Sequence, residues 1–408
     1  MEASYDALIV GAGPAGCAAA YDLAQGGRRV LLLDRRSFPR TKACACGLTR
    51  KTLAALRYAV DPIVEQRCEE IVLQRSEGAR IADKSLERRV RSRRPIAAMA
   101  VRERFDAFCL ERTLAAGREG GSVRFFRIDS IAALRQSASG VELEVLFSGD
   151  GGTHQRRTIS APVLIGADGS NGQTRRLSET QDGREPAWFH RGFALEATVP
   201  YAVLPVSLPQ GDAPQDLVFD FAPLEGGYGW LFPKGDHVNF GVGAFADGDP
   251  EQLKPVTRAL LAEYARTKLG VDLEALQVSA GVTVTGQHLG MGGEAYVPRG
   301  RVLLAGDAAG LVDPLTGEGI HSAIVSGQAA AAALLEDTRD LAWAYARRLW
   351  SLQQTLAFSR RAARAFYRDP AWGFRAMGHP LLRLLILKTY ADGLPAEKLL
   401  TAMNRFLK

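Results

Sequence analysis

The sequence predicts an α/β fold: a discontinuous, Rossmann-like dinucleotide-binding domain, an inserted antiparallel-sheet domain and a C-terminal helical region. Three patterns support this prediction. Near the N-terminus, a glycine-rich loop joins an apolar strand to an alanine-rich helix. Between residues 176 and 285, short and partly alternating apolar runs stand between glycines and prolines, which is typical of antiparallel strands. After residue 344, apolar and basic residues repeat at helical spacing.

Length and composition are those of an ordinary globular protein. The chain has 408 residues, of which 47% are hydrophobic and 24% are charged, enough for two or three lobes and a large core. The sequence contains no run of about 18 or more apolar residues, so we expect no membrane-spanning helix. The N-terminus enters an apolar strand almost at once, without the pattern of a signal peptide. We therefore expect a cytoplasmic protein whose five cysteines are mostly reduced.

Residues 7–36 carry the first glycine loop. An apolar strand leads into Gly11-x-Gly13-x-x-Gly16, and a second apolar strand ends at Asp34. The glycines suit a tight turn, a close approach to a pyrophosphate and close packing of helix on strand, while Asp34 can accept a hydrogen bond from a ribose hydroxyl. The cofactor-binding residues predicted in this unit are Gly11, Ala12, Gly13, Pro14, Ala15, Gly16, Asp34 and Arg35.

Two further clusters favour a flavin over a nicotinamide cofactor. One is the strand and Gly-Ala-Asp-Gly turn within 161–176, and the other is the strand, Gly-Asp pair and glycine turn within 300–334. An acid at a strand end can bind a ribityl hydroxyl, and a glycine turn that opens a helix stabilises negative charge on a reduced flavin. The residues predicted to bind the cofactor here are Asp168, Gly306, Asp307, Pro314, Gly317, Gly319 and Ile320.

Together, in this order, the three clusters resemble the flavoprotein monooxygenase-like family, which has the fold of para-hydroxybenzoate hydroxylase. The resemblance covers roughly residues 5–335 and implies FAD as the cofactor, but it does not specify the reaction. Residues 101–117 match the family's Arg-x-x-Phe-Asp helix start, which implies that Arg102 lies near the FAD phosphates. A surface salt bridge is the alternative for Arg102.

The stretch 225–243 resembles one subfamily more specifically. Tyr228, Trp230 and Phe232 alternate and should share one face of a strand that Pro233 ends. The stretch is similar to the aromatic-x-Trp-x-Phe-Pro-Lys…Asn-x-Gly-x-Gly signature of geranylgeranyl reductases, FAD enzymes that saturate isoprenoid double bonds on lipids. This resemblance implies that the four residues line a substrate cavity, and an apolar chain needs such a wall. A core stripe is the alternative.

The cysteines in Lys42-Ala-Cys44-Ala-Cys46-Gly47-Leu invite four explanations: a metal pair, a disulfide, a reactive thiol or packing. The same family has Lys-Pro-Cys-Gly-Gly-Gly-Leu here, which implies that Cys44 lies near the flavin ring, with Cys46 and Gly47 at the cofactor. No second Cys/His cluster supports a metal site, and so small a disulfide ring would be strained. We expect Cys44 to be a reactive or proton-donating thiol, with packing or a redox pair as alternatives. The cysteines that stand alone should be core residues: Cys17, Cys68 and Cys109.

The predicted domain limits follow from these assignments. The FAD-binding domain comprises 1–69, 99–175 and 286–335, the substrate domain comprises 70–98 and 176–285, and the C-terminal helical region is 336–408. Residues 253–270 should form an amphipathic helix on the substrate domain. We expect His321, just after the last glycine turn, to be a structural histidine rather than an acid–base group.

From Ala344 to Lys408 only three acids accompany many arginines, leucines and aromatic residues. The segment predicts helices packed on the FAD domain with arginines in water, or an interfacial surface that contacts anionic lipid at the inner face of a membrane. No nucleic-acid-binding module accompanies the charge, so we expect no nucleic-acid partner.

These observations predict an FAD-dependent reductase of carbon–carbon double bonds in an isoprenoid or similar apolar lipid. Reduced flavin N5 would supply a hydride and Cys44 a proton. No second Rossmann unit is evident, so an external donor, NADPH or a ferredoxin-like carrier, should reduce the flavin. One alternative is a flavin-dependent monooxygenase or halogenase, because 228–233 partly resembles the halogenase Trp-x-Trp-x-Ile-Pro signature. Another is a flavin and thiol redox sensor without turnover.

Overall fold

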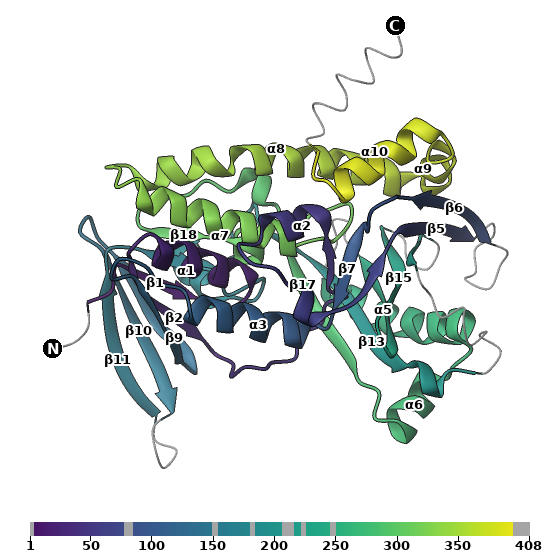
Figure 1. The fold of residues 1–408 in the computed structure, drawn as a ribbon, viewed down its shortest axis with the longest axis horizontal. Coiled ribbons are helices and arrows are strands. Elements are labelled where there is room, and N and C mark those ends of the chain that lie inside the picture. Colours follow the sequence, from purple (N-terminus) through teal and green to yellow (C-terminus); the bar gives the residue numbers. More distant parts are fainter. Residues whose placement is uncertain are drawn as a thin grey trace, which may run out of the picture.

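A parallel sheet forms the centre of one half of the molecule (Figure 1). The computed structural model describes residues 4–76, 85–148, 154–179, 184–205, 216–221, 226–244 and 250–394. The strand order is β18-β12-β1-β2-β8, and all neighbours are parallel. The strands are β1 (Ala7–Val10), β2 (Arg29–Asp34), β8 (Ser122–Arg127), β12 (Leu164–Gly166) and β18 (Val302–Leu304). Since β12 and β18 come from distant parts of the chain, this sheet is discontinuous in sequence, as predicted.

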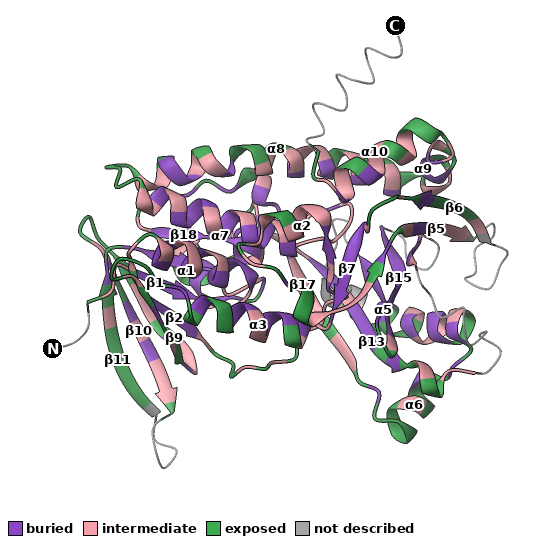
Figure 2. Cartoon of the chain, in the orientation of Figure 1, coloured by how far each residue is buried: buried purple, intermediate pink, exposed green. Residues whose placement is uncertain are grey.

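Both faces of the parallel sheet are covered, which explains why its strands are continuous apolar runs. Ile9 and Leu32 face a helical layer, whereas Leu8 and Leu33 pack against a small antiparallel sheet. The helices of the first layer are α1 (Pro14–Gln25), α3 (Arg102–Leu114) and α7 (Ile320–Leu335). The antiparallel strands are β9 (Ser130–Gln136), β10 (Val141–Ser148) and β11 (His154–Ala161). Figure 2 shows the buried β1 and β2 between these two layers.

A second, larger sheet carries the predicted antiparallel region. Its strand order is β17-β13-β16-β15-β14-β5-β6, with one parallel pair between β14 and β5. The strands are β5 (Glu70–Ser76), β6 (Ser85–Arg91), β13 (His190–Pro200), β14 (Leu217–Asp220), β15 (Gly227–Pro233), β16 (His237–Ala244) and β17 (Val284–Met291). One face packs on α5 (Pro250–Tyr264), which continues as a π-helical turn at Ala265–Leu269 and confirms the helix predicted over 253–270.

A small third sheet joins the two halves. It has the order β3-β7-β4 and consists of β3 (Gly47–Thr49), β7 (Ala97–Ala100) and β4 (Val64–Cys68). β3 follows the cysteine segment directly, so the small sheet positions that segment. β7 crosses the predicted boundary at 98/99, and β17 crosses the one at 285/286. The exact domain limits therefore stay a prediction, and strand continuity favours a boundary after Met291.

Three helices follow α7 along one long side of the molecule (Figure 1). They are α8 (Leu341–Arg368), α9 (Pro370–Ala376) and α10 (Pro380–Tyr390), and residues 395–408 of the predicted helical region lie outside the described residues. Among the helices that the structure describes, none has both the length and the apolar character needed to cross a membrane. The shorter elements are α2 (Arg50–Ala55), α4 (Gln173–Glu179), α6 (Leu273–Ser279) and 3₁₀ turns at Asp61–Ile63, Tyr201–Val203, Gly293–Ala295 and Gly306–Ala309.

Candidate active site

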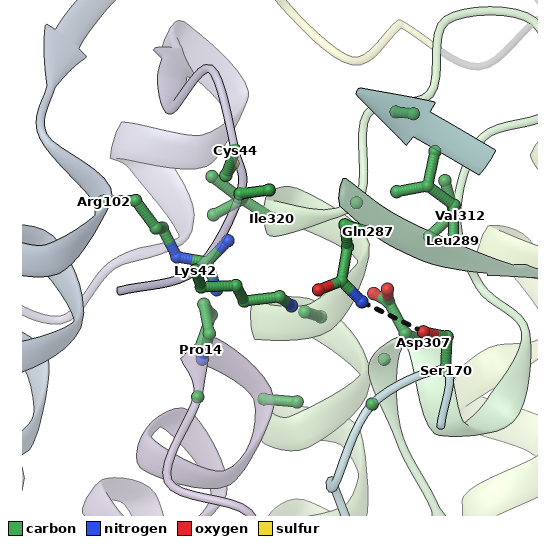
Figure 3. Close-up of a pocket in the computed structure, with 18 of the residues that line it drawn as sticks. Pro14, Lys42, Cys44, Arg102, Ser170, Gln287, Leu289, Asp307, Val312 and Ile320 are labelled. Carbon is green, nitrogen blue, oxygen red and sulfur yellow. Dashed lines mark hydrogen bonds between the residues drawn. The ribbon is translucent and has the colours of Figure 1, made fainter. Parts of the chain in front are cut away.

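A cavity of about 570 Å³ lies between the carboxyl ends of the parallel strands and the face of the seven-stranded sheet opposite α5, a face that also packs on the C-terminal helices. Ligands of open α/β sheets bind at such strand ends. The glycine loop, the segment 40–47 and the turn 316–320 line one side of the cavity, and the large sheet lines the other. In Figure 3, Pro14, Cys44 and Asp307 are among the residues around this space.

The glycine loop forms an open cradle at the N-terminus of α1. A Cβ on Gly11 would lie 2.2 Å from the carbonyl oxygen of Ala167, and a Cβ on Gly16 would lie 1.8 Å from that of Gly11. A Cβ on Gly13 would instead meet only Arg40, at 3.4 Å, so the space above Gly13 is open. No described side chain caps α1. Its first amides are therefore free for an anion, and the cradle fits a pyrophosphate.

Acidic residues at the strand ends complete a site for a dinucleotide. Asp34 accepts the backbone N–H groups of Ala12 at 2.7 Å and of Arg36 at 2.8 Å, which holds its carboxylate at the edge of the cavity. Asp168 accepts the N–H of Thr174 with one carboxylate oxygen, while the other oxygen is buried and has no partner among the described residues. Burial raises the pKa of Asp168. An unsatisfied buried oxygen of this kind fits a hydroxyl-bearing ligand, since it is costly to leave without a hydrogen bond.

Three basic residues surround the same end of the cavity. Arg102 donates from Nε to Asp106 at 2.8 Å, and Arg40 pairs with the other oxygen of Asp106 at 3.1 Å. Lys42 extends into the cavity toward Asp307 (Figure 3). Burial, followed by the charge of Arg102, lowers the pKa of Lys42. The alternative prediction, a salt bridge on the surface, is wrong for Arg102, because Arg102 is buried and lines the cavity.

The cysteine segment is anchored to both sheets. The backbone N–H of Cys44 donates to Oε1 of Glu196 at 2.7 Å. The ammonium group of Lys234 is buried and donates to the carbonyl oxygens of Ala45 at 2.5 Å and Ala100 at 2.8 Å. These contacts hold Cys44 at the cavity, on a loop that has no strand pairing of its own.

The two thiols are free and hydrogen-bonded to each other. The backbone N–H of Cys46 also donates to Sγ of Cys44 at 3.3 Å. The hydrogen bond from the Cys46 thiol and the charge of Arg102 hold the pKa of Cys44 well below its usual value, against the effect of burial. The same hydrogen bond and burial raise the pKa of Cys46. The surroundings therefore favour ionisation of Cys44 before Cys46.

The backbone of Cys46 explains why glycine suits this position. Cys46 has a φ of 49°, in the left-handed region that glycine adopts without steric cost. Cys17, Cys68 and Cys109 are buried, as predicted for core cysteines.

Aromatic side chains form the wall opposite the glycine loops. Tyr228, Trp230 and Phe232 all line the cavity, which confirms that they share one face of β15. The ring of Phe219 on β14 lies 5.3 Å from those of both Tyr228 and Phe232. Trp230 donates from Nε1 to Oδ1 of Asn239 at 2.8 Å, which fixes its indole ring. This part of the cavity fits an apolar ligand.

Glu318, within the last glycine turn, has a side chain that is largely buried. Glu318 lines the cavity, accepts the N–H of His321 at 2.7 Å and pairs with Lys51 at 3.3 Å. Burial, opposed by the charge of Glu318 and aided by that of Lys51, lowers the pKa of His321 to about 4. His321 does not line the cavity. It stays a structural histidine in our interpretation.

Most of the predicted site residues surround the cavity. Those that line it are Gly11, Gly13, Pro14, Ala15, Asp34, Arg35, Cys44, Cys46, Gly47, Arg102, Asp168, Gly306, Asp307, Gly317, Gly319, Ile320, Tyr228, Trp230 and Phe232. Those that do not are Ala12, Gly16, Pro314 and Pro233. Gly16 has a packing role and Pro233 ends β15 as predicted.

Several lining residues were absent from the predicted site. They include Arg40, Lys42, Ser170, Glu196, Phe219, Gln287 and Tyr390. Glu196 left the clearest signal, because it is an acid in an otherwise apolar alternating strand. Gln287, whose amide donates to Oγ of Ser170 at 3.2 Å (Figure 3), has no sequence pattern that would have predicted its place at the cavity. A possible metal-ligand group, Glu65 with Asp236 and His237, lies outside the lining residues.

Comparison with known proteins agrees with this geometry. A family model described as an FAD binding domain matches residues 4–342. The geranylgeranyl diphosphate reductase of Rhodobacter capsulatus is 28% identical over 337 residues, which are 81% of this chain and 75% of the relative. The menaquinone reductase of Mycolicibacterium smegmatis is 30% identical over 338 residues, 81% of this chain and 76% of the relative.

Solved structures share the fold. A geranylgeranyl bacteriochlorophyll reductase-like protein from Thermoplasma acidophilum has a TM-score of 0.66 and 19% identity, with 97% of this chain and 98% of that chain covered. A flavin-dependent brominase has a TM-score of 0.69 and 15% identity, with 99% of each chain covered. The open glycine cradle, the unsatisfied Asp168 oxygen and the family match agree on the cofactor, FAD. The chain thus belongs to the family defined by this FAD binding domain and is an FAD-dependent oxidoreductase, with geranylgeranyl and menaquinone reductases among its relatives.

Proposed function

We propose that this protein reduces carbon–carbon double bonds in an isoprenoid or a similar apolar lipid. The observation that carries the proposal is the aromatic wall formed by Phe219, Tyr228, Trp230 and Phe232, which faces the glycine loops across one cavity. A polyprenyl chain offers little to hydrogen-bond, so its recognition requires apolar side chains of this kind. Relatives named for the reduction of geranylgeranyl diphosphate and menaquinone support the same substrate class.

The chain's residues divide the work around the cofactor. Gly13 and the amides of α1 bind the pyrophosphate, Asp34 binds a ribose hydroxyl, and Asp307 binds the ribityl chain. When bound and reduced, FAD supplies a hydride. The aromatic wall excludes water and holds the alkene at the flavin. The cavity lining includes both the FAD-binding loops, at Arg35, and the aromatic wall, near Tyr390.

The second hydrogen of the product requires an acid at the same wall. Cys44, predicted for this role, satisfies the requirement of position, because it lines the cavity. A proton donor must also carry a proton, and the lowered pKa of Cys44 disfavours this. Cys44 can therefore act as the donor only when Cys46 passes its proton across their hydrogen bond. Proton delivery by Cys44 is therefore part of the proposal that mutagenesis has to test.

Oxygen-using chemistry is the second candidate function, and the brominase fold match favours it. Flavin-dependent halogenases and monooxygenases share this fold, so the fold alone does not separate them from reductases. The thiol pair favours a third candidate, a redox sensor in which Cys44 and Cys46 change state without substrate turnover. Substrate consumption in the absence of oxygen distinguishes the reductase from both.

The electron donor and the membrane contact are also proposals. An external donor, NADPH or a ferredoxin-like carrier, would reduce the flavin. The outer surface of α8–α10 exposes Trp350, Trp372 and Leu384 among the arginines, with exposed fractions of 58%, 57% and 51%. Aromatic and basic residues on one surface suit the interface of an anionic bilayer, from which an isoprenoid chain can enter the cavity.

An anaerobic half-reaction tests the proposed function. The bound flavin is reduced with dithionite, and its reoxidation is followed optically after a geranylgeranyl lipid is added without oxygen. Rapid reoxidation with a product two hydrogens heavier is the expected result. Failure of several polyprenyl lipids to reoxidise the flavin, combined with rapid reoxidation by oxygen through a peroxide-like species, would support the monooxygenase function instead.

A further inference from the structure

One carboxyl group stands on the apolar wall of the cavity, and the proposed reaction has not yet used it. Glu196 belongs to β13, is only 7% exposed and lines the cavity. Among the described residues that line the cavity, the other carboxylates, Asp34, Asp168, Asp307 and Glu318, come from the FAD-binding loops rather than from the large sheet. A buried acid on an apolar wall needs a reason, because burial of an unpaired carboxylate is costly.

The register of the large sheet places Glu196 beside the aromatic wall. Across neighbouring strands, Thr285, Glu196, Gly241, Trp230 and Phe219 form one row, and all but Gly241 line the cavity. A Cβ on Gly241 would lie 2.2 Å from the Trp230 indole, so the absence of a side chain there lets the indole extend toward β13. A substrate double bond on the wall therefore lies within the same row as the Glu196 carboxyl.

The orientation of Glu196 is fixed on two sides. Its Oε1 accepts the backbone N–H of Cys44 at 2.7 Å. Asn239 on β16 also hydrogen-bonds to the Glu196 side chain, and Asn239 is itself held by Trp230. These contacts position the carboxyl group between the flavin-side loop and the aromatic wall, which is where an acid for alkene reduction has to stand.

The surroundings of Glu196 favour its protonated form. Burial and then the negative charge of Cys44 raise the pKa of Glu196 to about 8, against the hydrogen bonds that it accepts and the charge of Lys234. The titratable groups that act on it are Cys44 from the loop and Lys234 after β15, while Asn239 and Thr285 on the flanking strands are neutral. An acid that is protonated near neutral pH is suited to proton donation.

We propose that Glu196 is a further catalytic residue, the general acid that protonates the second carbon of the substrate double bond. This inference rests on the proposed function. The first carbon receives a hydride from the reduced cofactor, which is thereby oxidised by two electrons. The π electrons of the double bond then form a new C–H bond with the proton of Glu196, whose O–H bond breaks. The resulting carboxylate regains a proton from solvent, because burial and then the negative charge of Cys44 favour the protonated form.

Glu196→Gln tests this role without removing the local structure, because the glutamine carbonyl still accepts the Cys44 N–H. In the anaerobic half-reaction, the variant should retain FAD and bind lipid with unchanged affinity, while flavin reoxidation slows by about 10²- to 10⁴-fold. Glu196→Asp should recover part of the rate. The matched control is Glu70→Gln, which removes a half-buried carboxylate from the same sheet outside the cavity and should react as the wild type does.

A second readout does not depend on turnover. Infrared spectra of the wild type should show a protonated carboxyl band at pH 7 that disappears as the pH rises through about 8 and is absent from Glu196→Gln. A wild-type protein that no geranylgeranyl lipid reoxidises would overturn the proposed function. If the wild type reacts and the Glu196→Gln variant reacts equally fast, Glu196 is not the acid. If the wild type reacts but lacks that infrared band, Glu196 is again not the acid, and in both cases the proposed function still stands.

Discussion

The backbone N–H of Cys44 donates to Oε1 of Glu196 at 2.7 Å, although 152 residues separate the two in the chain. This hydrogen bond joins the loop after β2 to the middle of β13, and so connects the cofactor side of the cavity to its apolar wall. Lys234 makes a second connection of the same kind through Ala45. Because both anchors come from the large sheet, the position of the thiol depends on how the two halves of the fold dock.

Replacement of Cys46 by glycine should raise the pKa of the Cys44 thiol. The variant removes the thiol hydrogen bond that lowers the Cys44 pKa most, while glycine adopts the φ of 49° without strain. The rate of alkylation of Cys44 by iodoacetamide, measured against pH, gives this pKa directly. We expect slower alkylation at pH 7 than in the wild type, and an unchanged profile would show that Cys46 does not tune Cys44.

Cys44→Ala should keep bound FAD and lose most of the alkene-reducing rate if Cys44 delivers the proton. If Glu196 is the acid, the same variant should keep a substantial rate, because the carboxyl remains, although its pKa falls once the thiolate charge is gone. Flavin reoxidation by a geranylgeranyl lipid is measured for Cys44→Ala and Glu196→Gln side by side. A variant of Cys44 that turns over normally excludes it as the proton donor.

Lys234→Met should destabilise the fold. The buried ammonium satisfies two carbonyl oxygens, those of Ala45 and Ala100, and the methionine leaves both without that donor. Each unsatisfied buried acceptor costs about 1–3 kcal/mol, so for two acceptors we expect a loss of roughly 2–6 kcal/mol in the free energy of unfolding. Urea unfolding measures it, with the half-exposed Lys388→Met as a control. Equal midpoints for the two variants would contradict the anchoring role.

Gly13→Ala and Gly16→Ala should separate cofactor binding from folding. The Cβ at Gly13 has 3.4 Å of space in the protein but occupies the place predicted for the pyrophosphate, so FAD affinity should fall while thermal stability of the FAD-free protein stays unchanged. The Cβ at Gly16 would lie 1.8 Å from a backbone oxygen, so stability itself should fall. Flavin content after dialysis and thermal unfolding provide the two measurements. Retained FAD in Gly13→Ala would contradict the cradle.

His321 should make the fold sensitive to acid. Its pKa is about 4 in the folded chain against an ordinary value of 6.5, so between these values the unfolded chain binds a proton that the folded chain does not. Stability is therefore intact above pH 6.5 and falls as the pH drops toward 4, by roughly 3 kcal/mol in total. His321→Asn should flatten this decline in denaturant titrations at several pH values. An identical decline in the variant would assign it to other groups.

Trp350→Ala and Trp372→Ala should weaken binding to lipid vesicles. Both indoles are more than half exposed on α8 and α9, which also carry the exposed Arg364 and Arg375. The structure therefore predicts sedimentation with phosphatidylglycerol vesicles that salt weakens, and little with phosphatidylcholine alone. Two results would contradict a membrane role for these helices. In one, the wild type sediments equally with both vesicle types, and in the other, the variants sediment as much as the wild type does.

Local patterns were enough to predict much of the FAD half. The strand–glycine–helix unit at 7–36 follows from residues adjacent in sequence, and its geometry is confirmed by the φ of 102° at Gly11 and the tight packing of Gly16. The alternation of Tyr228, Trp230 and Phe232 likewise fixes their shared face, because side chains on a strand alternate. In each case the information lies within one element or one turn.

The sequence by itself determined a dinucleotide-binding loop, the buried strands and the aromatic face, since each depends on local periodicity or on steric limits at glycine, while FAD as the cofactor was implied by the family resemblance. The tertiary structure decided which distant groups meet. Glu196 and Gln287 reach the cavity only because β13 pairs with β17 and β16 in one register, and a shift of one residue would turn Glu196 to the opposite face. The lowered pKa of Cys44 has both origins, because the hydrogen bond with Cys46 lies within the local segment, whereas the approach of Arg102 depends on the fold.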